Sequence, residues 1–239
     1  MKKLQVLLVV VVLMGNVMAH AKESSGWNWN VVPYAWMSGM KGDIAVKGVA
    51  APVDQSFSDI LKNLEIAGML ALDGNNGTWG TFADLFYVNL SDSADTSAGK
   101  VKADMDEWII SIAPYYRVVS NDKMTIDVGA GGRYIDMRID ISAPPGSRSG
   151  SQSWLDPIVT ARLRLPLADK FSLNMSGDIG GFGVESDLTW QLATSVNYLI
   201  NDTVDFLFGY RHLDLDYQNG DFLYDAATSG FALGVRISF

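Results

Sequence analysis

The last nine residues, 231–239, carry the pattern that most constrains how this chain can fold. Large apolar side chains occupy every odd position, and small or polar residues occupy the even positions between them. This period of two predicts a β-strand with one apolar face, ending on an aromatic residue. Such a face either covers a soluble core or meets lipid on the outside of a transmembrane barrel. The apolar residues of the strand are Phe231, Leu233, Val235, Ile237 and Phe239.

The amino-terminal segment has the three parts of an export signal. Lys2 and Lys3 supply positive charge, residues 4–14 are apolar apart from Gln5, and Ala19 and Ala21 flank a cleavage point. This arrangement predicts a secretory signal peptide over residues 1–21 and a mature domain over 22–239. The apolar run is shorter than the roughly 18 residues of a spanning helix, which disfavours a retained membrane anchor.

Composition narrows the class of protein further. The chain has 18 Lys and Arg against 27 Asp and Glu; without the two lysines of the signal the balance becomes 16 − 27 = −11. So acidic a chain is a poor partner for nucleic acid. The absence of cysteine excludes disulfides, thiol catalysis and a lipid-anchored cysteine. No later stretch is apolar enough for a membrane helix, so residence in a membrane requires a barrel.

Turn residues divide the mature chain, a single domain, into ten period-two segments. Tight turns near residues 75, 121, 169 and 201 alternate with longer connections, which is the layout of an up-and-down antiparallel transmembrane β-barrel with its termini in the periplasm. A secreted β-sandwich is the alternative. The expected strands are 27–40, 65–73, 77–91, 101–118, 123–141, 152–166, 171–182, 187–200, 203–217 and 229–239.

Two faces can be assigned on several of these segments. In 187–200, Leu192 and Val196 share an apolar face, and Gln191 and Ser195 share the polar face. Segments 123–141 and 171–182 alternate in the same way, whereas the first three segments give no clear phase. Aromatic residues recur near segment ends, where barrel strands meet lipid headgroups.

Several segments together resemble a family of uncharacterised Gram-negative outer-membrane β-barrel proteins, described by an outer membrane protein beta-barrel domain. The resemblance covers the mature chain and implies an outer-membrane location, but it brings no activity or catalytic residues. His212 departs from it, because related sequences tend to have an aromatic residue there. The segments are 32–36, 53–61, 154–159, 177–183 and 209–214.

Candidate chemistry is sparse. His212 is the one histidine after residue 21, and it neighbours Asp214. An omptin-like hydrolase at the barrel rim would use such a pair, whereas a solvated surface histidine needs no function. No motif places a serine near it for lipid-modifying chemistry. Acidic residues could bind Ca²⁺, but their spacing matches no binding loop, so neither a metal nor a cofactor is predicted. These acids are Asp92, Asp95, Asp214, Asp216, Asp221 and Asp225.

Residues 53–64 form the one candidate helix, within the longest connection, 41–64. Phe57, Ile60, Leu61 and Leu64 recur at helical spacing, with Asp54 or Ser56 as a cap. We expect this segment to cover the barrel mouth or enter the lumen, and placement against the membrane interface is the alternative.

Charges on the inward phase predict the contents of the lumen. Folding the last hairpin about Gly220 and Asp221 brings Asp205 beside Arg236, and folding about Asn121 brings Arg117 towards Asp127. Balanced, paired charges suit a narrow barrel with no continuous water path. The arginines are Arg117, Arg133, Arg162, Arg164, Arg211 and Arg236, and the acids are Asp84, Glu107, Asp127, Asp156, Asp178 and Asp205.

These patterns predict an integral outer-membrane barrel of a Gram-negative bacterium with a plugged lumen and a structural, surface-interaction or narrow-passage role. A substrate-selective small channel and the omptin-like hydrolase are the alternatives. The expected partners are outer-membrane lipid and the barrel-insertion machinery, which would read the carboxy-terminal strand.

Overall fold

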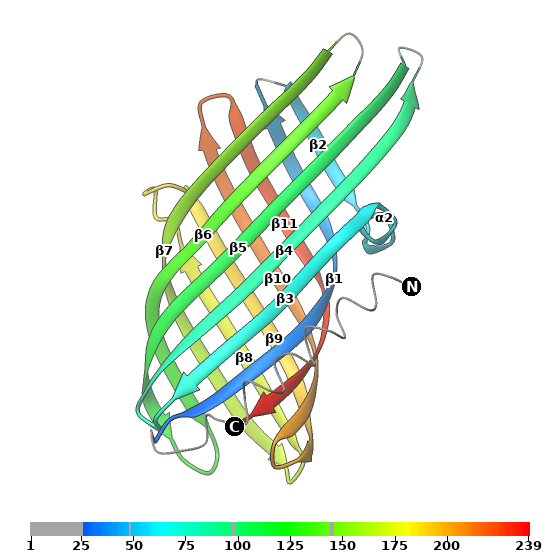
Figure 1. The fold of residues 1–239 in the computed structure, drawn as a ribbon. Helices are drawn as coiled ribbons and strands as arrows, with labels where there is room; N and C mark the ends of the chain where they lie inside the picture. Colours follow the sequence, from blue (N-terminus) through cyan, green and yellow to red (C-terminus); the bar gives the residue numbers. More distant parts are fainter. Residues whose placement is uncertain (1–25, 48, 97–98, 144–145) are drawn as a thin grey trace.

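A computed structural model describes residues 26–47, 49–96, 99–143 and 146–239, so the expected signal peptide lies outside the described residues. Ten antiparallel strands close into a barrel, with an eleventh strand and one short helix beside them (Figure 1). The elements are β1 (Asn28–Val46), β2 (Val49–Gln55), α2 (Phe57–Asn63), β3 (Leu64–Asn75), β4 (Trp79–Thr96), β5 (Gly99–Ser120), β6 (Thr125–Ala143), β7 (Gly146–Ala168), β8 (Phe171–Gly180), β9 (Leu188–Asn201), β10 (Val204–Asn219) and β11 (Phe222–Ser238).

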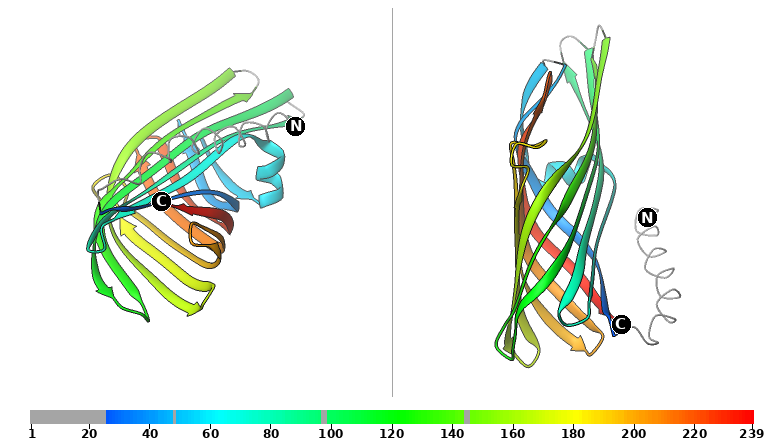
Figure 2. Two further views of the ribbon diagram at one scale, coloured as in Figure 1. Left: turned by 60° about the horizontal axis from the view of Figure 1, so that its bottom comes forward. Right: turned by 90° about the vertical axis from the view of Figure 1, so that its left-hand side faces the viewer.

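The barrel closes where its first and last strands meet. β1 pairs with β11 along most of its length, and the backbones of Trp29 and Phe239 exchange hydrogen bonds of 3.0 and 2.9 Å. Each later strand pairs with its neighbour in sequence, and the strands tilt around a common axis (Figure 2). β2 pairs with the last part of β1 and ends the strand order.

The ten predicted barrel strands are all present, but most of the predicted long loops are strands as well. The described residues of the predicted loops 92–100 and 142–151, together with residues 218–228, continue the hairpins β4–β5, β6–β7 and β10–β11, and β1 continues to Val46. The β4–β5 and β6–β7 hairpins project furthest (Figure 1). The connection predicted at 183–186 does form a loop between β8 and β9.

The two faces of a strand change places in polarity along its length: the apolar residues lie outside in one part and inside in the other. In β10, Phe206 and Tyr210 are exposed on the outside, whereas Leu213, Leu215 and Tyr217, further along, are buried inside. The pairing of β10 with β11 runs through this change without a shift. A membrane-spanning strand needs about 9–11 residues. β10 has 16, so it is longer than a single membrane crossing requires.

We call the two parts of the barrel the membrane half, next to the tight turns, and the outer half. The membrane half is apolar outside and polar inside. The outer half has the reverse arrangement, with a buried apolar core in which the rings of Trp154 and Tyr217 stack 3.8 Å apart. This outer core consists of Trp36, Met40, Val46, Phe86, Val88, Ile109, Ile135, Met137, Ile139, Trp154, Leu213, Leu215, Tyr217, Phe222, Tyr224 and Ala226.

Candidate functional site

Two ion pairs predicted from hairpin register are in contact inside the membrane half. Arg117 Nε lies 2.8 Å from Asp127 Oδ1, and the two residues face each other across β5 and β6. Arg236 Nε lies 2.7 Å from Asp205 Oδ1 across β10 and β11. Each arginine donates through two nitrogens to its carboxylate, which is the stronger geometry for such pairs.

A third pair was not predicted. Arg162 Nη1 lies 2.6 Å from Asp73 Oδ2, and its guanidinium lies 4.8 Å from the centroid of the Tyr115 ring. Tyr115 in turn donates a hydrogen bond to Asp73. The faces of the second predicted strand were unassigned, so Asp73 could not be placed inside from the sequence.

Two further arginines form a buried layer beneath the outer core. Arg133 Nη2 lies 2.7 Å from Asp178 Oδ1, and Arg211 Nη2 lies 3.1 Å from Asp84 Oδ1. Arg211 also donates to Gln191 Oε1 at 2.6 Å. We call these residues the arginine layer. Its charges are paired and hydrogen-bonded, which offsets the cost of burial.

Two of the predicted lumen charges take other roles. Asp156 lies opposite Arg133 in the register, yet it accepts hydrogen bonds from the backbone N–H and hydroxyl of Ser186, at 2.9 and 2.6 Å. It therefore anchors the loop between β8 and β9. Arg164 lines a cavity in the membrane half.

That cavity, of about 560 Å³, shows that the ion pairs line the membrane half and do not fill it. Arg117 and Arg236 reach partners on neighbouring strands along the wall, whereas Arg162 on β7 reaches Asp73 on β3, and space remains between these pairs. This corrects the expectation of a lumen packed with charges at that level. The densest packing lies above, in the arginine layer and the outer core. The absence of a continuous water path stays a prediction.

His212 lies on the outer surface of the wall and not at the mouth. Its Nδ1 is 2.6 Å from the hydroxyl of Ser229, its Nε2 is 3.9 Å from Asp214, and its ring lies 4.5 Å from that of Trp190. The expectation that no serine is within reach is therefore wrong. The hairpin register that pairs Asp205 with Arg236 also pairs His212 with Ser229, so the sequence held the information.

Three of the acidic candidates lie together on one face, because Asp216 pairs with Asp225 across β10 and β11 and Asp214 is two residues away along the strand. Asp92 faces the interior, Asp214, Asp216 and Asp225 lie on β10 and β11, and the side chain of Asp95 lies outside the described residues. Among the described residues no group of three or more His, Cys, Asp or Glu could hold a metal ion. No helix in the described part of the chain is long and apolar enough to cross a membrane.

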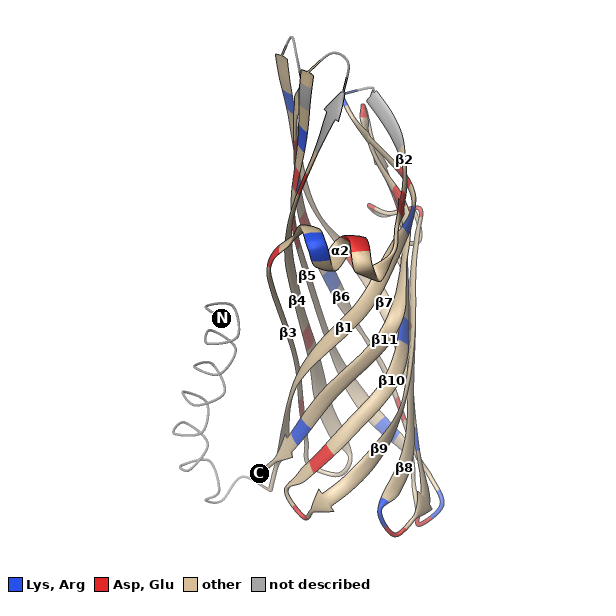
Figure 3. Ribbon diagram, turned by 90° about the vertical axis from the view of Figure 1, so that its right-hand side faces the viewer, with Lys and Arg blue, Asp and Glu red and all other residues tan. Residues whose placement is uncertain are grey.

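The helix α2 is capped by Ser56, one of the two predicted caps, but it is shorter than the predicted segment 53–64 and lies elsewhere. Ser56 and Asp59 form a reciprocal capping box at its start. It covers 57–63, because Val53 belongs to β2 and Leu64 begins β3. The helix crosses the side wall between β3 and β1 (Figure 3), not the mouth of the barrel.

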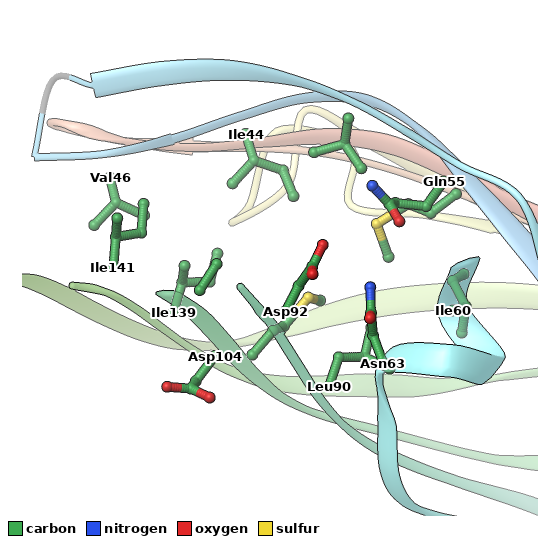
Figure 4. A pocket seen from close by; sticks show the side chains of 14 residues that line it. Ile44, Val46, Gln55, Ile60, Asn63, Leu90, Asp92, Asp104, Ile139 and Ile141 are labelled. Carbon is green, nitrogen blue, oxygen red and sulfur yellow. The ribbon is translucent and has the colours of Figure 1, made fainter. Parts of the chain in front are cut away.

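Behind α2 lies an apolar pocket of about 240 Å³ in the outer half. Ile60 reaches it from the helix, and Ile139 and Ile141 face it from β6 (Figure 4). Asp92 points towards its centre, whereas Asp104 points away. The lining residues are Met40, Ile44, Val46, Val53, Gln55, Ile60, Asn63, Leu90, Asp92, Ala103, Asp104, Met105, Ile139 and Ile141.

Solved structures with a similar fold are outer-membrane proteins. The outer membrane protease OmpT of Escherichia coli matches with a TM-score of 0.54 at 10% identity, over 91% of this chain and 99% of that one. The transport unit of the autotransporter AIDA-I of Escherichia coli gives 0.47 at 7% identity, over 93% of both chains. Neisserial surface protein A gives 0.41 at 12% identity, over 90% of this chain and 98% of that one.

No protein-family model and no curated protein matches the sequence. At these identities the solved structures define the fold alone. The protein has the fold of the bacterial outer-membrane β-barrel proteins.

Proposed function

We propose that this protein is a narrow-passage barrel of the Gram-negative outer membrane that binds small apolar molecules in its outer half. The pocket behind α2 carries the proposal. An apolar cavity of about 150 Å³ stays dry and accepts benzene. The present cavity is larger, at about 240 Å³, so it can hold an aromatic compound or a short alkyl chain.

The outer surface supports residence in the outer membrane. Exposed apolar side chains, such as Val196, Phe208 and Leu233, cover the membrane half. Exposure of such a continuous apolar surface to water would be unfavourable, whereas lipid accommodates it. The export signal expected over residues 1–21 agrees with this location. Cell fractionation tests it: the protein should be found with the outer membrane and should migrate differently on gels before and after heating.

The interior supports a barrel that does not conduct along its axis. The outer core and the arginine layer lie between the apolar pocket and the cavity of the membrane half. Reconstituted into planar bilayers, the protein should give no discrete conductance steps. Steady steps would favour the alternative of a selective channel.

Ligand binding can be measured with N-phenyl-1-naphthylamine, an uncharged dye that brightens in apolar surroundings. Ala103 lines the pocket, so Ala103→Trp should fill it and weaken binding about tenfold or more. Ala227→Trp makes the same change outside the barrel and should leave binding unaltered. Equal affinity of both variants in amphipol would show that the dye binds elsewhere.

The contact between Ser229 and His212 resembles part of an acyl hydrolase facing the lipid, but the surrounding geometry argues against that activity. A serine nucleophile needs its histidine, an acid that orients the histidine, and donors for the oxyanion. Here Asp214 is 3.9 Å away, beyond hydrogen-bond distance, and the strands around Ser229 use their backbone in the sheet. We therefore expect no labelling of Ser229 by a fluorophosphonate. Labelling that His212→Ala abolishes would establish the hydrolase.

A further inference from the structure

We infer that an apolar molecule held behind α2 leaves sideways into the outer leaflet, through a gap between β1 and β3 that α2 covers. The inference rests on the proposed function and adds a route and a ligand class to it.

The gap is a break in the strand ladder. β1 pairs with β3 over Asn28–Pro33 and Leu70–Asn75, and with β2 only from Met40 onward. Residues 34–39 of β1 and 64–69 of β3 therefore have no strand pairing with each other. Between the two unpaired edges, Trp36 N contacts Met69 Sδ at 3.2 Å, and a thioether is a weak acceptor. On the inner side of the break, Tyr34 donates a hydrogen bond to Asp84 of β4, and the Trp36 ring packs 5.8 Å from that of Phe86.

The helix that covers the break is loosely held. No residue of α2 is buried. It has seven residues, too few for stability without packing. Its capping box joins Ser56 to Asp59 within the same segment and adds no bond to the wall. A segment of this kind can move without disturbing the ladder on either side.

The break lies at the edge of the lipid. Met40 pairs with Gln55 on one side and Thr228 on the other, and Thr228 pairs with Leu213. At this level the outer face of β10 changes from apolar to acidic. Phe57 and Leu61 of α2 are exposed here, at 38% and 55%, and can enter the headgroup region.

The axial alternative is costly for the same molecule. To pass down the barrel it would have to separate the packed outer core, open the arginine layer and cross a cavity lined by ion pairs. Separating paired buried charges leaves them uncompensated. The sideways route requires the displacement of α2 and of the contacts that Tyr34 and Trp36 make across the break, and none of these contacts is an ion pair.

The polar part of the lining selects against anions. Its polar members are Gln55, Asn63, Asp92 and Asp104, of which Asp104 points away, and no lysine or arginine lines the described pocket. An anionic group would meet the carboxylate of Asp92 without a cation to pair with it. The ligand class is therefore small uncharged apolar compounds, and fatty-acid carboxylates are excluded.

The route can be closed with a crosslink. Ala35 and Gly68 lie two residues beyond the last ladder pair, Pro33 with Leu70, and an added Cβ at Gly68 meets no atom within 4 Å. The chain has no cysteine of its own. Ala35→Cys with Gly68→Cys, crosslinked by oxidation or a short bismaleimide and verified by mass, should slow uptake of N-phenyl-1-naphthylamine by expressing cells several-fold. Reduction of the disulfide should restore uptake.

Lys41→Cys with Ala227→Cys is the matched control, because it joins β1 to β11 across an existing pair and keeps the apolar pattern of residues 231–239. Its crosslink should leave uptake unchanged. Binding of the dye to the crosslinked Ala35→Cys/Gly68→Cys protein in amphipol should also be unchanged. The sulfonated analogue of the dye, 1-anilinonaphthalene-8-sulfonate, should bind at least about tenfold more weakly than the uncharged dye. Normal uptake with the gap crosslinked would overturn the sideways route alone. Failure of the wild-type protein to bind the uncharged dye would overturn the proposed function.

Discussion

Single buried arginines illustrate which contacts a sequence can reveal. The pairs Arg117–Asp127 and Arg236–Asp205 join adjacent strands, so a hairpin turn is enough to predict them. Arg162 and Asp73 lie on β7 and β3, and Arg133 and Asp178 on β6 and β8. Such pairs across the barrel depend on its curvature and on side-chain rotamers, which cannot be predicted from the register of a hairpin.

We predict that Arg211→Leu is among the most destabilising changes in the membrane half. It leaves the buried carboxylate of Asp84 uncompensated, which should cost about 3–5 kcal/mol. Arg211→Leu with Asp84→Leu should recover much of that loss. Denaturant unfolding in lipid vesicles measures both. A double variant as unstable as the single one would show that the cost comes from packing.

At the scale of elements, alternation reveals the strands but not how far they extend. A segment such as 218–228 contains Asn, Gly and Asp at its turn, which resembles a loop, while Phe222 and Tyr224 continue the inward face. The exchange of the two faces conceals this continuity. The pocket was also hidden, because it joins α2 to strands that are distant in the sequence.

We predict that the tolerance of β9 to charge follows depth. Val196 pairs with Phe208 within the membrane half, so Val196→Arg should cost about 2–4 kcal/mol in lipid. Leu192 pairs with His212 at the lipid edge, and Leu192→Arg should cost about 0–1 kcal/mol. Ser195→Arg, facing the cavity, is the control for the inward face. Equal costs at Val196 and Leu192 would show that the membrane boundary does not lie at the level of Leu192.

We also predict that α2 loosens in acid. Hydrogen bonds from Ser56 lower the pKa of Asp59 below its ordinary value. A lowered pKa stabilises the helix above the ordinary pKa, and that support is lost as the pH falls through the lowered value. The Asp59→Asn variant should show faster hydrogen exchange in α2 at neutral pH. Unchanged exchange would mean that the cap contributes nothing.

For the whole molecule, the last residue extends the ladder that closes the barrel. Phe239 joins Trp29 through two backbone hydrogen bonds, and its strand supplies the pattern that the insertion machinery is expected to read. We predict that deletion of Phe239 leaves the protein in the periplasm, as measured by fractionation and heat-modified gel mobility. Phe239→Tyr keeps an aromatic end and should assemble. Normal membrane levels of the deletion variant would contradict the prediction.

The unbroken pairing of β10 with β11 places one ladder in two solvents. A slip of one residue turns every side chain to the opposite face. In this barrel such a slip would bring Arg211 and Asp205 into hydrocarbon and, in the same movement, Leu213 and Leu215 into water. A register slip is therefore unfavourable at both ends of the hairpin, because it places charges in lipid at one end and apolar side chains in water at the other.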